Sequence, residues 1–118
     1  MLESLSTDFE YTDERGKLVQ LIHSGYEQVN VLTSKAGVLR GRHYHKESKE
    51  AFYVISGKVE VEVELGNSYE KKNFEEGDFF LIRPYTTHSL FFPADTILIV
   101  LYDQCIEKVQ GEKDIYVC

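Results

Sequence analysis

The chain has 118 residues, 42% hydrophobic and 28% charged, which is the composition of one globular domain that can build its own core. A formal net charge of -7 argues against a nucleic-acid partner and an anionic membrane surface, because phosphate groups bind to basic faces. No apolar run reaches membrane-spanning length and the N-terminus lacks a signal-peptide pattern, so we expect a cytoplasmic protein. Two cysteines, Cys105 and Cys118, do not make a disulfide framework.

Short apolar runs separated by turn signals follow one another along the chain, and no segment shows a helical period. After a lead-in at residues 1–7, the predicted strands are 9–12, 18–22, 29–33, 38–45, 51–55, 59–65, 69–74, 79–82, 87–92, 97–102 and 115–117. Many short strands at regular spacing predict an all-β double-sheet sandwich or barrel, here as a single domain over residues 1–118.

Two of the predicted strands have a distinctive pattern. Strand 59–65 alternates apolar side chains with Glu60, Glu62 and Glu64, which predicts a buried face and a row of carboxylates in water rather than a cation site. Strand 97–102 is apolar throughout, so we expect both of its faces to be buried, either inside the fold or in a subunit contact.

Three histidines and one glutamate are candidate metal ligands. His43, His45, Glu50 and His88 offer imidazole and carboxylate groups, which a borderline divalent metal prefers. Because successive side chains of a strand point to opposite faces, His43 and His45 point the same way. Glu50 can join them if residues 46–49 turn the chain back, whereas His88 has to come from another strand. Two histidines at this spacing could also both face solvent on an edge strand, which leaves a surface role open.

Two longer motifs surround these residues. The positions of Gly37, His43, His45, Glu50 and Gly57 fit the pattern Gly-x5-His-x-His-x4-Glu-x6-Gly, and the stretch resembles motif one of the cupin family. The string GDFFLIRPYTTH, which ends at His88, resembles cupin motif two, with Tyr85 where glycine is usual. Together the two motifs cover residues 37–88, about half of the chain.

The resemblance to the cupins implies a double-stranded β-helix, the jelly-roll barrel, with the site inside its mouth. It also implies that His43, His45, Glu50 and His88 bind one metal ion. Zinc, iron, manganese and nickel are all compatible with these ligands, and zinc is slightly favoured. The resemblance further implies a homodimer, which fits the apolar strand at 97–102.

A narrower resemblance points to the sugar-nucleotide branch of the cupins. The strings DERGKL and VLRGRHYHK resemble the 3,5-epimerases of deoxythymidine-diphosphate 4-keto sugars, in which the residue matching His43 is a general base and no metal is used. At the position of His45 those epimerases often carry glutamine. The string RGRHYHKESKEAFYVISG is closer to the zinc-binding cupin domain of bacterial capsular-sugar reductases, which acts on a UDP-linked keto sugar.

A metal of this kind can polarise the carbonyl of a keto sugar, and a side chain then moves a proton on the neighbouring carbon. The candidate catalytic residues are Tyr53, Tyr85 and Tyr102, of which Tyr102 resembles the acid of the epimerases. Arg40 and Arg15 are candidate substrate-binding residues, because guanidinium groups match diphosphate oxygens. Strict alternation puts Arg40 on the face opposite His43 unless a bulge at the intervening glycine re-aims it.

Three classes of function follow from these observations. We favour an enzyme, an epimerase or isomerase whose small-molecule substrate is a keto sugar, either linked to a nucleotide or free. An iron-dependent cupin dioxygenase also fits three histidines and one carboxylate, because open coordination positions remain. A non-catalytic binding or sensing cupin is the third class. The identity of the metal separates the first two, since zinc argues against redox chemistry.

Overall fold

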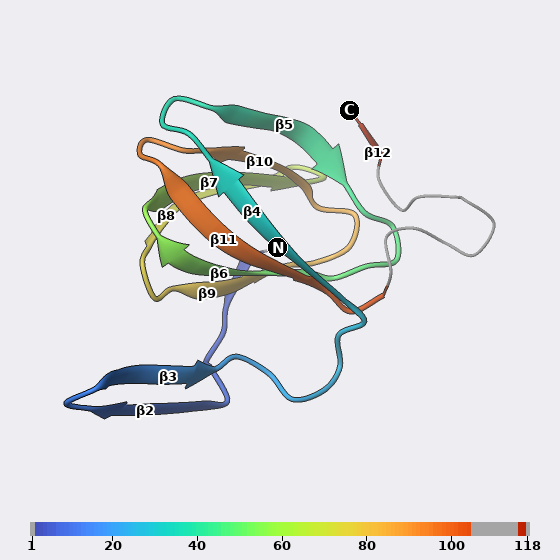
Figure 1. Ribbon diagram of the computed structural model, residues 1–118. Coiled ribbons are helices and arrows are strands. Elements are labelled where there is room, and N and C mark those ends of the chain that lie inside the picture. Colours follow the sequence, from blue (N-terminus) through green and yellow to red (C-terminus); the bar gives the residue numbers. More distant parts are fainter. Residues whose placement is uncertain (1, 105–115, 118) are drawn as a thin grey trace.

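The computed structural model describes residues 2–104 and 116–117, and it shows two facing antiparallel sheets and a separate hairpin (Figure 1). The first sheet has the order β1 (Leu2–Ser4), β9 (Phe79–Ile82), β6 (Glu50–Ser56), β11 (Thr96–Tyr102), β4 (Gln28–Ser34). The second has the order β12 (Tyr116–Val117), β5 (Leu39–Tyr44), β10 (Thr87–Phe91), β7 (Lys58–Leu65), β8 (Ser68–Glu75). This is the all-β double sheet that the sequence predicts.

The main core lies between the two sheets. Val59, Val61 and Val63 of β7 are fully buried there, and the intervening glutamates are partly exposed, as their alternation predicts. The ring of Phe80 stacks between those of Phe52 and Phe74, with centroids 4.9 and 3.9 Å away. Apolar side chains therefore fill the interior between β6, β7, β8 and β9, and the His/Glu cluster described below lies outside this apolar part.

A second, smaller core covers the outer face of the first sheet. It contains Ala51, Phe79, Leu81 and Leu101, against which chain segments on either side of the hairpin pack. Strand β11 is therefore covered on both faces along part of its length, as predicted. Its first apolar residue, Ile97, is nevertheless 37% exposed, because the outer core does not reach that end of the strand.

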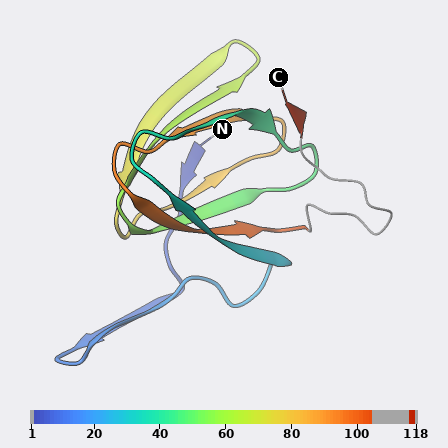
Figure 2. The same cartoon turned by 45° about the horizontal axis from the view of Figure 1, so that its top comes forward.

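The hairpin of β2 (Phe9–Asp13) and β3 (Gly16–Gln20) projects away from the two sheets (Figure 2). The prediction placed the second of these strands two residues too late, because the turn takes only Glu14 and Arg15. Among the described residues, no helix has the length and hydrophobicity that crossing a bilayer requires.

The lead-in predicted at residues 1–7 is wrong in part, because β1 forms there and pairs with β9. At the other end of the chain, Tyr116 and Val117 pair with β5 as a last edge strand. Residue 115 and both cysteines lie outside the described residues.

Candidate functional site

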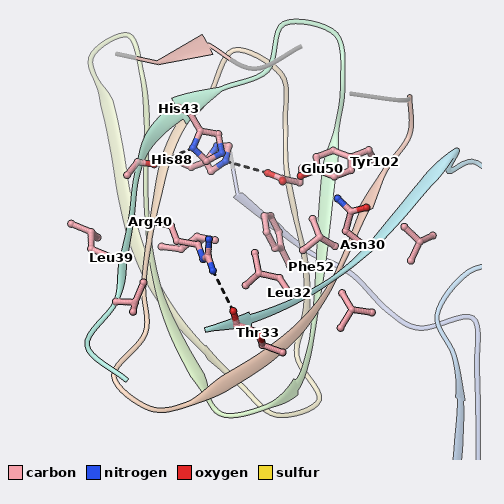
Figure 3. Close-up of a pocket in the computed structure, with 16 residues that line it drawn as sticks. Asn30, Leu32, Thr33, Leu39, Arg40, His43, Glu50, Phe52, His88 and Tyr102 are labelled. Carbon is pink, nitrogen blue, oxygen red and sulfur yellow. Dashed lines mark hydrogen bonds and ion pairs between the residues drawn. The ribbon is translucent and has the colours of Figure 1, made fainter. Parts of the chain in front are cut away.

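Three side chains from residues 43–50 and a fourth, His88, meet at one point between the sheets. Figure 3 shows three of them, His43, Glu50 and His88. His43 comes from β5 and His88 from the neighbouring β10, and these two residues are paired across the strands. His45 follows the end of β5, and Glu50 is the first residue of β6. One ligand atom from each of the four lies within 4.8 Å of the others. We call these four residues the His/Glu cluster.

Backbone carbonyl groups orient two of the imidazoles. His43 Nδ1 lies 3.1 Å from the carbonyl oxygen of Gly41, and His88 Nδ1 lies 3.2 Å from that of Thr86. A carbonyl oxygen only accepts, so each Nδ1 carries a proton, and in the neutral imidazole each Nε2 keeps its lone pair. This tautomer is the one that a metal-binding imidazole has when its other nitrogen donates to a backbone oxygen.

Glu50 is buried beside the imidazoles. Its Oε1 lies 3.1 Å from His88 Nε2 and 3.4 Å from His45 Nε2. Burial raises the pKa of the Glu50 carboxyl, but the two imidazoles more than offset this and hold that pKa well below its usual range. Glu50 Oε1 and His88 Nε2 are buried without a hydrogen bond of normal geometry to any described residue. Such orphaned acceptors fit a metal ion, which would satisfy both.

A pocket of about 1020 Å³ opens beside the cluster and is lined by residues of both sheets, including His43, Glu50 and His88. Arg40 also lines this pocket, because β5 contains a bulge: Arg40 and His43 are three residues apart, but their partners Leu90 and His88 are only two apart. The sequence left the side of Arg40 conditional on such a bulge. Its guanidinium reaches across to β4 and donates to the carbonyl oxygen of Thr33 (Figure 3).

The structure separates the candidate tyrosines. Tyr102, at the end of β11, lines the pocket, and its ring centroid is 5.6 Å from that of His45. Burial and the nearby Glu50 carboxylate raise the pKa of the Tyr102 phenol well above its usual range, so the phenol stays protonated. Tyr53 lies on the opposite face of the first sheet, in the outer core beside Phe79, so the structure does not bring this candidate to the site.

Tyr85 lies in the turn before β10 and is 57% exposed. Its φ of 63° is left-handed, which is the conformation that glycine adopts easily at this motif position. The Tyr85 N–H donates to the carbonyl oxygen of His45 over 2.6 Å. The turn therefore keeps the backbone shape that glycine would give, and His88 reaches the cluster.

Two further placements differ from the sequence-based expectations. Arg15 is at the tip of the projecting hairpin, with its side chain 81% exposed and bound to Asp13, so this chain does not bring it to the pocket. Asn30 of β4 points into the pocket near Glu50 and Tyr102 (Figure 3), although the sequence did not single it out. Its polar character on a strand with alternating valines was the available signal.

Solved structures of nucleotide-sugar enzymes share this fold. The WlaRB TDP-quinovose 3,4-ketoisomerase from Campylobacter jejuni has a TM-score of 0.80 at 19% identity, over 96% of this chain and 92% of that one. A mutant of the 3,4-ketoisomerase QdtA from Thermoanaerobacterium thermosaccharolyticum, in complex with TDP-4-keto-6-deoxyglucose, has a TM-score of 0.78 at 16% identity, over 98% and 84%. The dTDP-4-dehydrorhamnose 3,5-epimerase from Sulfolobus tokodaii has a TM-score of 0.71 at 21% identity, over 86% and 74%. The predicted jelly-roll fold is thereby confirmed.

No curated protein sequence matches the chain, but one family model does. The model of the family described as "Polysaccharide biosynthesis C-terminal domain" matches residues 11–104, which include the whole His/Glu cluster, Arg40 and Tyr102. The chain therefore belongs to the polysaccharide biosynthesis C-terminal domain family.

Proposed function

We propose that this protein is a metal-dependent isomerase or epimerase of a nucleotide-linked keto sugar. The observation that carries the proposal is the His/Glu cluster in the wall of a pocket that also presents Tyr102 and Arg40. The volume of that pocket is that of a small-molecule site. Solved enzymes with the same barrel act on TDP-linked sugars, which supports a substrate of this class.

The four residues of the cluster would hold one divalent ion, for which zinc is favoured because its common ligands are imidazole and carboxylate. When bound, such an ion polarises the sugar carbonyl and makes the neighbouring C–H more acidic. His43 suits the role of a metal ligand, which requires a neutral imidazole. Burial and the neighbouring His88 lower the pKa of its imidazole, which is therefore neutral at pH 7.

The reaction needs a base that takes a proton from the carbon beside the carbonyl and an acid that returns one. Tyr102 would be the acid, because its phenol stays protonated and lies in the pocket beside the cluster. It would regain its proton from solvent, to which the base would release the one that it took. Return of the proton to the other face of the same carbon gives an epimer, and its return to a neighbouring carbon gives an isomer. Arg40 and Asn30 line the same pocket and would bind the diphosphate or the sugar hydroxyls through their donors.

The test is incubation of the protein with TDP- and UDP-linked 4-keto-6-deoxyglucose in D₂O, followed by proton NMR. The proposal expects deuterium at a carbon beside the carbonyl, or a shift of the carbonyl to the neighbouring carbon, with at least one of the two sugars. Absence of both deuterium and a carbonyl shift with both sugars, in protein that carries its metal, would overturn it.

Elemental analysis of protein purified without added ions separates the remaining functions. Zinc together with exchange supports the proposed reaction. Exchange in protein without metal would assign proton removal to His43 instead, and iron without exchange would favour the dioxygenase. Bound nucleotide sugar without any turnover would favour the sensing cupin.

We further expect a homodimer, because apolar side chains are exposed together on the outer face of the first sheet. Val29 and Val31 of β4 and Ile97 of β11 share this face, and Val31 is 69% exposed. Exposed apolar surface of this kind is typical of an interface. Light scattering is expected to give twice the chain mass, and Val31→Glu to give the monomer. A monomeric wild-type protein would contradict this expectation.

A further inference from the structure

We propose that Asp103 is a positioning residue for the His/Glu cluster, which it fixes through the loop between His45 and Glu50; this inference rests on the proposed metal-binding function. Asp103 Oδ1 accepts a hydrogen bond from the Lys49 N–H over 2.7 Å. The Asp103 N–H donates in return to the Lys49 carbonyl oxygen over 3.2 Å. Two hydrogen bonds thus join the residue that follows β11 to the residue that precedes Glu50.

The contact lies at the end of the loop that leads to Glu50. The loop of residues 46–49 has no regular secondary structure, yet it connects two members of the cluster. A loop is more mobile than the strands that it joins, so its shape has to be fixed by other contacts. At the first end, the Tyr85 N–H binds the His45 carbonyl oxygen, and at the second end Asp103 binds Lys49. Both ends of the loop are therefore held by backbone hydrogen bonds.

The carboxylate of Asp103 is the part of this contact that a substitution can remove. A charged acceptor makes a shorter and stronger hydrogen bond to a backbone N–H than a neutral one does. The two contacts join residues 54 positions apart in the sequence, so they tie β11 to the loop. Asp103 also directly follows Tyr102, so the same end of β11 positions the loop and supplies Tyr102 to the pocket.

A matched control exists elsewhere in the barrel. Asp95 Oδ1 accepts a hydrogen bond from the Ala36 N–H over 2.8 Å, which ties the loop before β5 to the loop before β11. Asp103→Ala and Asp95→Ala each remove one carboxylate that binds a loop N–H. Asp103→Asn keeps an oxygen acceptor and is the conservative variant. The whole protein, stripped of metal and reloaded, is titrated with zinc against a competing chelator. Amide hydrogen exchange at Lys49 is measured in the metal-free form.

Asp103→Ala is expected to weaken zinc binding by about tenfold, the lower end of what loss of an outer hydrogen-bond partner costs a metal site. It is also expected to speed amide exchange at Lys49. Asp103→Asn is expected to restore most of both, and Asp95→Ala to leave both at wild-type values even where its melting temperature falls equally.

The outcomes distinguish the two proposals. Wild-type zinc affinity in Asp103→Ala would overturn the positioning role while leaving the metal site intact, and so would an equal loss in Asp95→Ala. If the wild-type protein binds no zinc, the proposed metal function fails, and amide exchange at Lys49 alone decides whether Asp103 fixes the loop. Unchanged exchange would then overturn the inference.

Discussion

His43 and His88 are directly paired across the antiparallel strands β5 and β10, with the centroids of their imidazoles 4.2 Å apart. Each donates its Nδ1 proton to the carbonyl oxygen of the residue two positions earlier in the chain. The strand ladder therefore fixes half of the cluster. The other half, His45 and Glu50, flanks a loop, and this difference in rigidity explains why the contacts of the loop matter for the site.

Removal of one imidazole is expected to empty the proposed metal site. His43→Ala should lose most of the metal that the wild-type protein retains, because three remaining ligands bind an ion more weakly. Glu60→Ala is the control, since this carboxylate belongs to the partly exposed row on the outside of β7. Metal content is measured by elemental analysis after dialysis. Equal metal in both variants would contradict the assignment.

Two of the three tyrosine candidates, Tyr102 and Tyr53, are expected to behave differently. Tyr102→Phe removes a phenol in the pocket and should lower turnover by roughly 10²–10⁴-fold, the usual contribution of a general acid. Tyr53→Phe removes a phenol in the outer core and should keep wild-type turnover. The comparison of kcat for the two variants checks the placement. A loss confined to Tyr53→Phe would mean that the outer face of the sheet holds the site.

The sequence predicted the cluster because the strand period and the spacing of the motifs both constrain it. His43 and His45 share a face by alternation, and Glu50 opens the next strand as expected. The same alternation could have excluded Tyr53. If Glu50 points inward, Phe52 does too, and the residue between Phe52 and Val54 faces outward.

Other features depend on contacts that no local pattern contains. In β4, alternation suggests that Val29 and Val31 face inward, but both are mostly exposed, whereas Leu32 packs against the main core and Asn30 lines the pocket. Strand β1 has a single apolar residue and exists because the edge of β9 pairs with it. The hydrogen bonds of Asp103 join residues far apart in the sequence, which only the folded chain brings together.

Arg40 is expected to act in substrate binding. Its guanidinium is held at the pocket by Ser34 Oγ and the Thr33 carbonyl oxygen, at 3.2 Å from each. Arg40→Ala should raise KM for a nucleotide sugar by about 10–100-fold, since hydrogen bonds to charged groups contribute roughly 1.5–3 kcal/mol. Lys71→Ala removes a cation on the outside of β8 and should leave KM unchanged. Equal KM values in the two variants would contradict the role of Arg40.

The metal-free protein is expected to lose stability in acid in two stages. The pKa of His43 is lower in the folded protein than its usual 6.5, so below about pH 6.5 the unfolded chain binds a proton first and unfolding becomes easier. The pKa of Glu50 also lies below its usual 4.5, so a second loss begins near that pH. Stability from both groups is present at higher pH and disappears as the pH falls.

Urea unfolding at a series of pH values measures this dependence. Glu50→Gln removes the second stage, because glutamine does not titrate, and should flatten the curve below about pH 4.5. A curve of unchanged slope in that variant would show that other carboxyl groups cause the acid loss.

Two motif glycines are expected to differ in what they tolerate. Both have left-handed φ, +93° at Gly57 and +87° at Gly37. A Cβ at Gly57 would lie 2.4 Å from the Asp95 carbonyl oxygen and from Thr96 Oγ1, whereas a Cβ at Gly37 would meet nothing within 4 Å. Gly37→Ala should therefore cost only the backbone strain, about 1–2 kcal/mol. Gly57→Ala adds a steric clash and should lower the free energy of unfolding by roughly 2–5 kcal/mol. Urea unfolding of both variants measures the difference, and equal losses would mean that the turn after β6 is looser than the structure shows.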